Sequence, residues 1–447
     1  MKRVFVQTAG KGSKALAVLI SVAAAARICL ALLYRPGEAP DSTLYRRLAE
    51  QIRAFDFKDY DGARTPVYPL LLALLPGNLD AIWLVQSVLG IATTVLLYLV
   101  VARCTGSERM GLIAGLAHAL SFNHIAFESA VVAEALATFL IALAVWRAHR
   151  LQLGPLRRGE PLLLGLVCAV AALTRPMYVV LGLAVGLYLL LLDMPRRLTA
   201  AAVFAAAFAA PLFLWAAFNA RTVHYFGLST LMGYNLTQHS GAFIEQAPPE
   251  YAALRDIYLK HRQRRIAEAN THSMTIWYAR DEMRRATGLS DAELSRRLGK
   301  MSITMFARHP GLYLRGVARS WVLFWAVPKD WRPAFARLPA SGSVLRVLWW
   351  CEAWVFRVAY VLFLAVSLPV LWCAAANRRR RPNPWLTAGL MVAAVLLASC
   401  IQALLEYGEN ARYALPTQPL ATAALVMVAF SWRRRIESPS PAPKISG

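Results

Sequence analysis

The chain has 447 residues, of which 58% are hydrophobic, and its 49 lysines and arginines against 25 acidic residues give a formal net charge of +24. Soluble domains contain about 45–50% apolar residues, so this composition excludes an ordinary soluble enzyme. A nucleic-acid-binding protein would carry its basic residues on a polar surface, whereas here short basic clusters separate long apolar runs. The charge therefore indicates the topology of a membrane protein.

Ten apolar runs approach the length of about 20 residues that a membrane-spanning helix needs. They cover residues 15–34, 80–102, 109–124, 126–147, 161–175, 176–193, 198–218, 344–375, 384–405 and 412–432. With these spans, the basic clusters at 147–158, 196–197, 378–381 and 433–435 all fall on the side of the N-terminus. Lysine and arginine favour cytoplasmic loops, so we expect an all-α polytopic membrane protein with both termini in the cytoplasm.

The predicted spans divide the chain into four parts. Residues 1–218 form an N-terminal membrane module of seven spans, with a first outer loop at 35–79. Residues 219–343 form an outer loop with juxtamembrane helices. Residues 344–432 form a C-terminal module of three spans, and residues 433–447 form a cytoplasmic tail. We expect the outer loop to lack a deep core of its own, and we expect no soluble C-terminal domain.

Local signals within 219–343 predict helices that lie outside the membrane. Ser290 and Glu293 have the spacing of a capping box, and Gly288 is typical of a helix end. The apolar segment 311–327 is interpreted as an interfacial helix whose tryptophans sit in the outer aromatic belt. Counting it as an eleventh span would move the cluster at 378–381 to the outside.

Ionisable residues at the outer ends of spans are costly and are therefore candidate functional residues. Arg27 lies in the first span and Asp41 just beyond it, where Asp41 could alternatively be the N-cap of a helix that begins at Ser42. Arg64 begins the string RTPVYP, whose two prolines fix the backbone before an apolar run. A structural turn is the alternative there.

The start of the fourth span carries three more ionisable residues. His124 and Glu128 are four residues apart, so they could share a helix face and bind a metal. A lone His/Glu pair is a weak signal, however, and we assign no metal site. Glu134 lies deeper in the apolar run, and its burial requires a partner.

Two further arginines lie on the outer side. Arg175 interrupts the junction of the fifth and sixth spans, and Arg412 and Tyr413 stand at the mouth of the last span, which Pro416 would distort. Either arginine could instead extend to lipid phosphates. Together, Arg64, Arg175 and Arg412 form an outward cationic set near carboxylates, which suits an anionic lipid head group in a cavity.

Seven strings in this order resemble the GT-C superfamily of polyprenyl-phosphate-sugar-dependent glycosyltransferases, in particular the bacterial branch related to protein O-mannosyltransferases and the aminoarabinose transferases of lipid A. The strings are Arg27 in the first span, PDxxLYRRLAEQI around Asp41 and Tyr45, ARTPVYPLLLALL at 63–75, ESAVVAEALATFLIALAVW at 128–146, LTRP at 173–176, MFARHPGLYL at 305–314 and ARYALPTQPL at 411–420. The resemblance implies a GT-C fold, an outward-facing active site, a lipid-linked sugar donor and inversion at the anomeric carbon.

The resemblance also implies roles for individual residues. Asp41 matches the acid taken as the general base and Glu134 a supporting acid, although many members carry paired acids where this chain has Asp41 followed by Ser42. The positions expected to bind the carrier phosphate are Arg64, Tyr68, Arg412 and Tyr413, to which Arg175 adds its charge, and the supporting positions are Arg27, Tyr45 and Glu128.

The chemistry of such a donor agrees with the resemblance. A polyprenyl phosphate is already a good leaving group, so no nucleotide site is needed, and the sequence has no P-loop or dinucleotide fingerprint. A general base contributes about 10²–10⁴-fold, and arginines stabilise the charge on the departing phosphate. No cofactor is required; a divalent cation is possible but unsupported. The expected partners are the lipid-linked sugar, a lipid, glycan or protein acceptor, and membrane lipids, with no nucleic acid.

Two other functions remain open at this point. A transporter or flippase of an anionic or polyprenyl lipid would place its charges near the bilayer midplane, whereas these cluster at the outer boundary. A membrane glycan polymerase or ligase shares the substrate class, but the PDxxLY and RTPVYP strings argue against it. The bias towards Ala, Leu and Arg suggests a GC-rich bacterium, hence an inner membrane and a periplasmic active site.

Overall fold

The protein is described by a computed structural model that covers residues 2–75, 77–154, 159–328, 332–379 and 382–437. Throughout these ranges the secondary structure is helical, apart from two isolated β-bridges, Tyr34 with Ala336 and Gly37 with Ala130. The predicted all-helical membrane fold is therefore confirmed. Most of the predicted tail, residues 438–447, lies outside the described part, and the last helix continues to Glu437 rather than ending near 432.

Within the described ranges, six helical segments are long and apolar enough to cross a membrane. They are α1 (Lys2–Leu33, with Lys14–Leu33 as its apolar part), α4 (Leu79–Thr105), α10 (Arg197–Thr222), α16 (Pro339–Ala376), α17 (Pro384–Leu405) and the segment Asn410–Arg433, made of α18 (Asn410–Ala414), the 3-10 turn η5 (Leu415–Thr417) and α19 (Gln418–Glu437). Pro416 lies in the 3-10 turn, which is the distortion predicted from the sequence.

The remaining predicted spans correspond to shorter helices. A pair bent by 53°, α5 (Glu108–Ala119) and α6 (Phe122–Glu128), brings the number of candidate spans to seven if it counts as one. The others are α7 (Glu134–Arg150), α8 (Glu160–Thr174) and the unit of η1 (Pro176–Tyr178) and α9 (Val179–Leu191). The predicted boundaries at 109–124 and 126–147 were wrong. The helix breaks there because buried polar side chains such as Asn123 and His124 bond to α16 and η5 instead of facing lipid.

The segment 219–343 folds into helices, as predicted, but it also has a hydrophobic core that the prediction denied it. Its elements are α11 (Met232–Ser240), η2 (Gly241–Gln246), η3 (Pro249–Tyr251), α12 (Ala252–Ala269), α13 (Thr275–Thr287), α14 (Asp291–Arg308), α15 (Pro310–Phe324) and η4 (Pro333–Phe335). The side chains buried in this core include Tyr258 of α12, Met283 of α13 and Leu298 of α14. The predicted capping box at Ser290 and Glu293 is present, and Gly288 ends α13.

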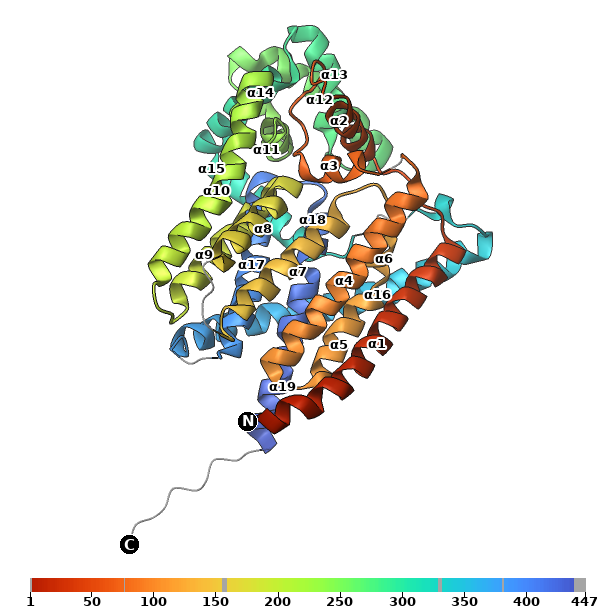
Figure 1. The fold of residues 1–447 in the computed structure, drawn as a ribbon. Coiled ribbons are helices and arrows are strands. Elements are labelled where there is room, and N and C mark those ends of the chain that lie inside the picture. Colours follow the sequence, from red (N-terminus) through yellow and green to blue (C-terminus); the bar gives the residue numbers. More distant parts are fainter. Residues whose placement is uncertain (1, 76, 155–158, 329–331, 380–381, 438–447) are drawn as a thin grey trace.

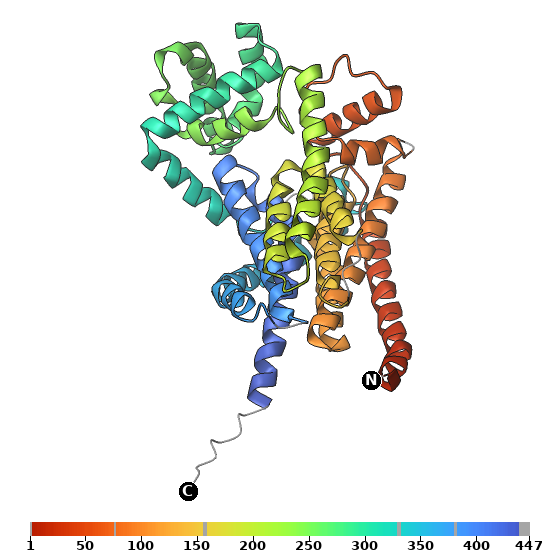
Figure 2. The same ribbon diagram turned by 60° about the vertical axis from the view of Figure 1, so that its left-hand side comes forward.

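The helices form two regions. The first outer loop contributes α2 (Ser42–Ala54) and α3 (Val67–Ala73), which gather with α11–α14 at one end of the molecule. The start of α1 and the end of α19 lie at the opposite end (Figures 1 and 2). The first and last described helices therefore start and end, respectively, at the same end of the helical bundle.

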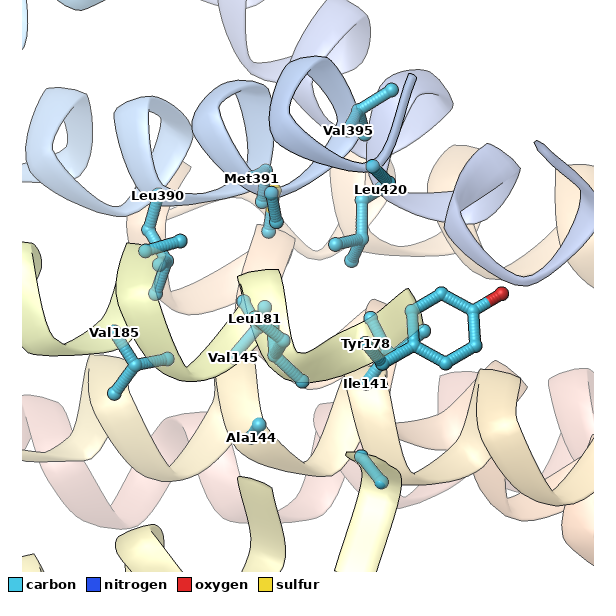
Figure 3. Close-up of a cluster of buried hydrophobic side chains, with 14 of the residues drawn as sticks. Ile141, Ala144, Val145, Tyr178, Leu181, Val185, Leu390, Met391, Val395 and Leu420 are labelled. Atoms are coloured by element: carbon cyan, nitrogen blue, oxygen red, sulfur yellow. The ribbon is translucent and has the colours of Figure 1, made fainter. Parts of the chain in front are cut away.

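The main core lies among α7, α9, α17 and α19. Figure 3 shows side chains of these helices meeting in the middle of the bundle, including Ile141, Leu181, Met391 and Leu420. Since α7 and α9 are short and packed in this core, their outer ends are held in fixed positions relative to α18. The main core also includes Trp325 from the end of α15, so the prediction that it lies in an aromatic belt was wrong.

Candidate active site

Asp41 is fixed where the loop after α1 enters α2. Gly37 pairs with the segment after α6 through hydrogen bonds to Ser129 and from Val131, and the Ser42 hydroxyl donates to the Val131 carbonyl at 2.8 Å. Asp41 occupies the N-cap position of α2, but its side chain makes no capping hydrogen bond. Its carboxylate is directed instead to two arginines. The alternative that Asp41 serves only as a helix cap is therefore excluded.

The first of these arginines is Arg64, from the loop before α3. Its Nη2 donates to Asp41 Oδ1 at 2.6 Å, and its guanidinium lies over the ring of Tyr45, 4.6 Å from the ring centre. The following residue, Thr65, donates to the carbonyl of Thr174 at the end of α8. The proline-rich segment is thus held between the surface helix α2 and the bundle.

Arg412 reaches three carboxylates from the short helix α18. Its Nη2 lies 3.1 Å from Asp41 Oδ2, its Nε 2.6 Å from Glu134 Oε1 and its Nη1 3.2 Å from Glu409 Oε2. The side chain is 5% exposed. A planar guanidinium suits such an arrangement because its donors point in fixed, divergent directions.

Glu134, at the start of α7, is 1% exposed and receives a second arginine. Arg175 Nη1 lies 2.5 Å from Glu134 Oε1, and its guanidinium stacks over the ring of Tyr413 at 4.4 Å. Glu134 was predicted to require a partner, and it has two, Arg175 and Arg412. The structure brings Asp41, Glu134 and the three predicted arginines into one cluster where the outer helices meet the bundle.

The arginines dominate the electrostatics of Asp41. Burial alone would raise the pKa of this carboxyl, but the charges of Arg64, Arg412 and Arg175 outweigh burial and hold the pKa well below its usual range. Asp41 is thus ionised at any physiological pH. Its basicity is low as long as both arginines are paired with it.

A large cavity of about 520 Å³ opens beside the cluster. Its charged and aromatic lining includes Arg64, Arg175, Tyr45, Tyr413 and Glu406. The rest is mainly apolar and is contributed by the start of α9, the end of α17 and the segment between α10 and α11. Cationic groups beside an apolar wall are the combination that a lipid phosphate needs.

A smaller cavity of about 110 Å³ lies on the other side of Arg412. Its charged lining consists of Arg412, Glu409, Glu38 and Arg332, and the remainder consists of aromatic residues such as Phe335 and of smaller residues. Asp41 is hydrogen-bonded to Arg64, which lines the large cavity, and forms an ion pair with Arg412, which lines the small one. The carboxylate therefore links an arginine of the large cavity to an arginine of the small one, although Asp41 is not among the residues that line either cavity.

Tyr68 is not where the phosphate role would place it. The side chain is fully buried, its hydroxyl donates to Gln86 at 2.9 Å, and its ring packs edge-on against Tyr45. It does not line the large cavity. We therefore remove Tyr68 from the phosphate-binding set; it supports Tyr45, which packs against Arg64.

Arg27 and Glu128 form a separate buried ion pair at 2.5 Å, between α1 and α6. Gly90 on α4 makes room for it, since a β-carbon there would collide with Glu128 and Arg27. The weak metal candidate is not supported, because His124 bonds to Ser121 and the Leu415 carbonyl while Glu128 is taken by Arg27. Among the residues that the structure describes, no group of three or more His, Cys, Asp or Glu could hold a metal.

Sequence reasoning singled out the segment of Arg412 and Tyr413 but assigned no role to two carboxylates in it. Glu409 pairs with Arg412, and Glu406 lies on the large cavity. Both stand in the short segment between α17 and α18, close to the predicted Arg412 and Tyr413. An acidic residue so close to an apolar span was the signal that could have singled them out.

Part of this chain, including some residues of the site, is similar to a known family. Residues 66–218 match the family described as dolichyl-phosphate-mannose-protein mannosyltransferase. The match covers about a third of the chain, including Glu134 and Arg175. It supports the resemblance predicted from the sequence motifs. None of the curated proteins matches this chain.

Two solved structures of the oligosaccharyltransferase from Archaeoglobus fulgidus are similar over nearly the whole chain. The protein AglB in complex with an inhibitory peptide and a dolichol-phosphate has a TM-score of 0.49 and 14% identity, covering 97% of this chain and 52% of that one. The enzyme tethered to an acceptor peptide has a TM-score of 0.48 and 14% identity, covering 96% and 51%. This chain spans about half the length of each.

Proposed function

We propose that this protein is a membrane glycosyltransferase that moves a sugar from a polyprenyl-phosphate carrier to an acceptor. The proposal rests above all on the position of Asp41, whose carboxylate lies between one arginine on a large apolar-walled cavity and another on a smaller cavity. A transfer reaction needs a base between donor and acceptor. The description of the matching family, which names dolichyl-phosphate mannose, supports this class of donor.

The large cavity is the proposed donor site. Arg64 and Arg175 bind the phosphate, because guanidinium groups donate in pairs to phosphate oxygens. The prenyl chain lies against the apolar wall and leaves past Leu183 and Phe226, which line the same cavity and are 60% and 67% exposed. Exposed apolar side chains at the mouth are what a lipid entering from the bilayer would contact.

Asp41 is the proposed general base. It removes the proton of an acceptor hydroxyl as that oxygen bonds to the anomeric carbon, while the bond from this carbon to the phosphate oxygen breaks and the phosphate leaves with the electron pair. The arginines stabilise the growing negative charge on the phosphate. A base and a leaving group on opposite faces of the sugar give inversion.

Donor binding is expected to make Asp41 a better base. A phosphate on Arg64 competes for the donor that now holds Asp41 Oδ1. Losing part of its positive surroundings raises the pKa of the carboxyl towards its usual value. The base would therefore be strongest when the donor is in place.

We also propose that three arginines supply the positive charge that a metal provides in other transferases, so that no resident cofactor is needed. The location that fits this account is a bacterial inner membrane with the cluster on the periplasmic side. The start of α1 and the end of α19, with their neighbouring basic residues, lie at the opposite end (Figure 1).

Native mass spectrometry of the protein purified from membranes tests the donor site. We expect a polyprenyl phosphate to co-purify with the wild type and to be lost in Arg64→Gln. The matched control is Arg47→Gln, an exposed arginine of α2 outside both cavities. Retention of the lipid in Arg64→Gln would contradict the assignment. If the protein in vesicles instead moves a lipid-linked sugar across the bilayer without removing the sugar, the transporter alternative is favoured.

A further inference from the structure

The lining of the large cavity includes a buried carboxylate with an unusual set of partners. Glu406 is 4% exposed and lies just after α17. Gln402 donates to its Oε2 at 3.0 Å and Gln238 to its Oε1 at 3.4 Å. Within the described ranges no lysine or arginine comes within ion-pair distance of it, in contrast to Asp41 and Glu134.

One tyrosine that lines the cavity lies next to both this carboxylate and an arginine. The ring of Tyr413 packs against the guanidinium of Arg175, and its side chain also interacts with Glu406. A cationic group over its ring and a carboxylate beside it thus share a single aromatic side chain that lines the cavity. A phosphate held at Arg175 would place whatever is bonded to it near Glu406.

The polar groups around Glu406 are suited to hydroxyl groups. Gln402 lines the cavity beside it, and Asn235 and Ser229 line the same cavity from the segment that leads into α11. A carboxylate oxygen has more than one lone pair, so each Oε can accept a further hydrogen bond besides its amide partner. Amides both donate and accept, which matches the mixed character of a sugar hydroxyl.

We propose that Glu406 and Gln402 bind hydroxyl groups of the donor sugar and determine which sugar is transferred. The proposal rests on the proposed function, because it takes the phosphate of the same donor to be bound at Arg64 and Arg175. A site built to hydrogen-bond a hydroxyl discriminates strongly against an analogue that lacks it, since its buried polar groups are then left unpaired. Glu406 is thus a specificity-determining residue.

A purely structural role is served by a different part of Glu406. Its backbone carbonyl accepts from Ser320 at 2.6 Å and from Asn410 at 3.2 Å, which fixes the turn between α17 and α18. These bonds do not involve the side chain. The variant Glu406→Gln keeps both the shape of the residue and its backbone bonds, so it removes the charge with little change to the fold.

The test compares binding of two probes, farnesyl phosphate and farnesyl phosphate linked to mannose, glucose or galactose. For the sugar that the wild type binds most tightly, we expect Glu406→Gln to weaken binding by about tenfold to a hundredfold, the range for a lost hydrogen bond to a charged group. Binding of farnesyl phosphate itself stays within about twofold. Glu282→Gln, on the surface of α13 and away from both cavities, is the control with unchanged binding.

Deoxy sugars locate the contact. A donor that lacks the hydroxyl bound by Glu406 is expected to bind equally well to the wild type and to Glu406→Gln, since the interaction is already missing. An equal loss of both probes in Glu406→Gln, or no loss of either, would overturn the proposal while leaving the phosphate site intact. A wild type that binds no farnesyl phosphate would contradict the proposed function itself.

Discussion

Arg412 lies 3.1 Å from Asp41 and so joins the last candidate span to the first outer loop. The same guanidinium is bonded to Glu134 at the start of α7. One side chain therefore connects three segments that are distant in sequence. Arg412 acts both on the electrostatics of Asp41 and on the geometry of the boundary between the two cavities.

Arg412→Lys is expected to abolish this arrangement even though it keeps the charge. An ammonium group is a point charge without the planar set of donors that reaches Asp41, Glu134 and Glu409 together. We expect transfer to fall by about 10²-fold or more, as for a misplaced catalytic group, with a lowered Tm. The readouts are turnover and thermal unfolding of the purified protein. Normal activity in the lysine variant would contradict the bridging role.

Asp41→Asn tests the base. The variant keeps the shape of the side chain but cannot take a proton, so we expect transfer to fall by about 10²–10⁴-fold while farnesyl phosphate still binds. The matched control is Asp56→Asn, an exposed aspartate of the same loop, which should transfer normally. Substantial activity in Asp41→Asn would remove Asp41 from the role of base.

The pH dependence of stability provides a separate test of the charges around Asp41. The pKa of an aspartate in an unfolded chain is about 3.9, and the pKa of Asp41 is lower than this in the folded chain. A depressed native pKa adds stability above the unfolded pKa, and that stability is lost as the pH falls. The Tm advantage of the wild type over Asp41→Asn should be complete above about pH 5 and shrink in more acidic solution. A difference that does not change with pH would contradict this.

The ion pair of Arg27 and Glu128 is expected to be structural. Removing one partner leaves an uncompensated buried charge, which costs about 3–5 kcal/mol, so Arg27→Met alone should be strongly destabilised. The double variant Arg27→Met/Glu128→Gln should recover most of the loss and retain transfer. Thermal unfolding of both variants checks this, and a double variant as unstable as the sum of the single changes would argue against it.

Chelation tests the proposal that arginines replace a metal. Treatment of the purified protein with EDTA, followed by exchange into metal-free buffer, should leave turnover unchanged, because Arg64, Arg175 and Arg412 already provide the positive charge. Loss of activity that is restored by adding back Mg²⁺ or Mn²⁺ would contradict this part of the account.

Much of the candidate site could be predicted because charges in apolar surroundings are few. Asp41, Arg64, Glu134, Arg175 and Arg412 were each chosen for that reason, and the structure brings them together. Which carboxylate pairs with which arginine could not be predicted from the sequence. Whether Glu134 meets Arg175, Arg412 or both depends on how α7, α8 and α18 pack, and this is decided by contacts between distant segments.

The errors have similar physical causes. Tyr68 looked like a phosphate ligand because of its neighbours in the motif, but its hydroxyl is taken by Gln86, which lies on α4. The predicted boundaries between α5 and α7 were wrong because hydropathy averages over polar residues such as His124, whose partner Leu415 lies far away in sequence. Glu406 faces a cavity that exists only once α9, α11 and α17 are assembled.

The measurement that most directly tests the account is acceptor-dependent consumption of a lipid-linked sugar. The purified protein in vesicles is given a panel of polyprenyl-phosphate sugars together with an extract of bacterial envelope acceptors, and the lipids are followed by mass spectrometry. We predict that sugar-free polyprenyl phosphate appears with one donor, only when acceptor is present, and not with Asp41→Asn. No release from any donor, or release that is equal in Asp41→Asn, would contradict transfer at this cluster.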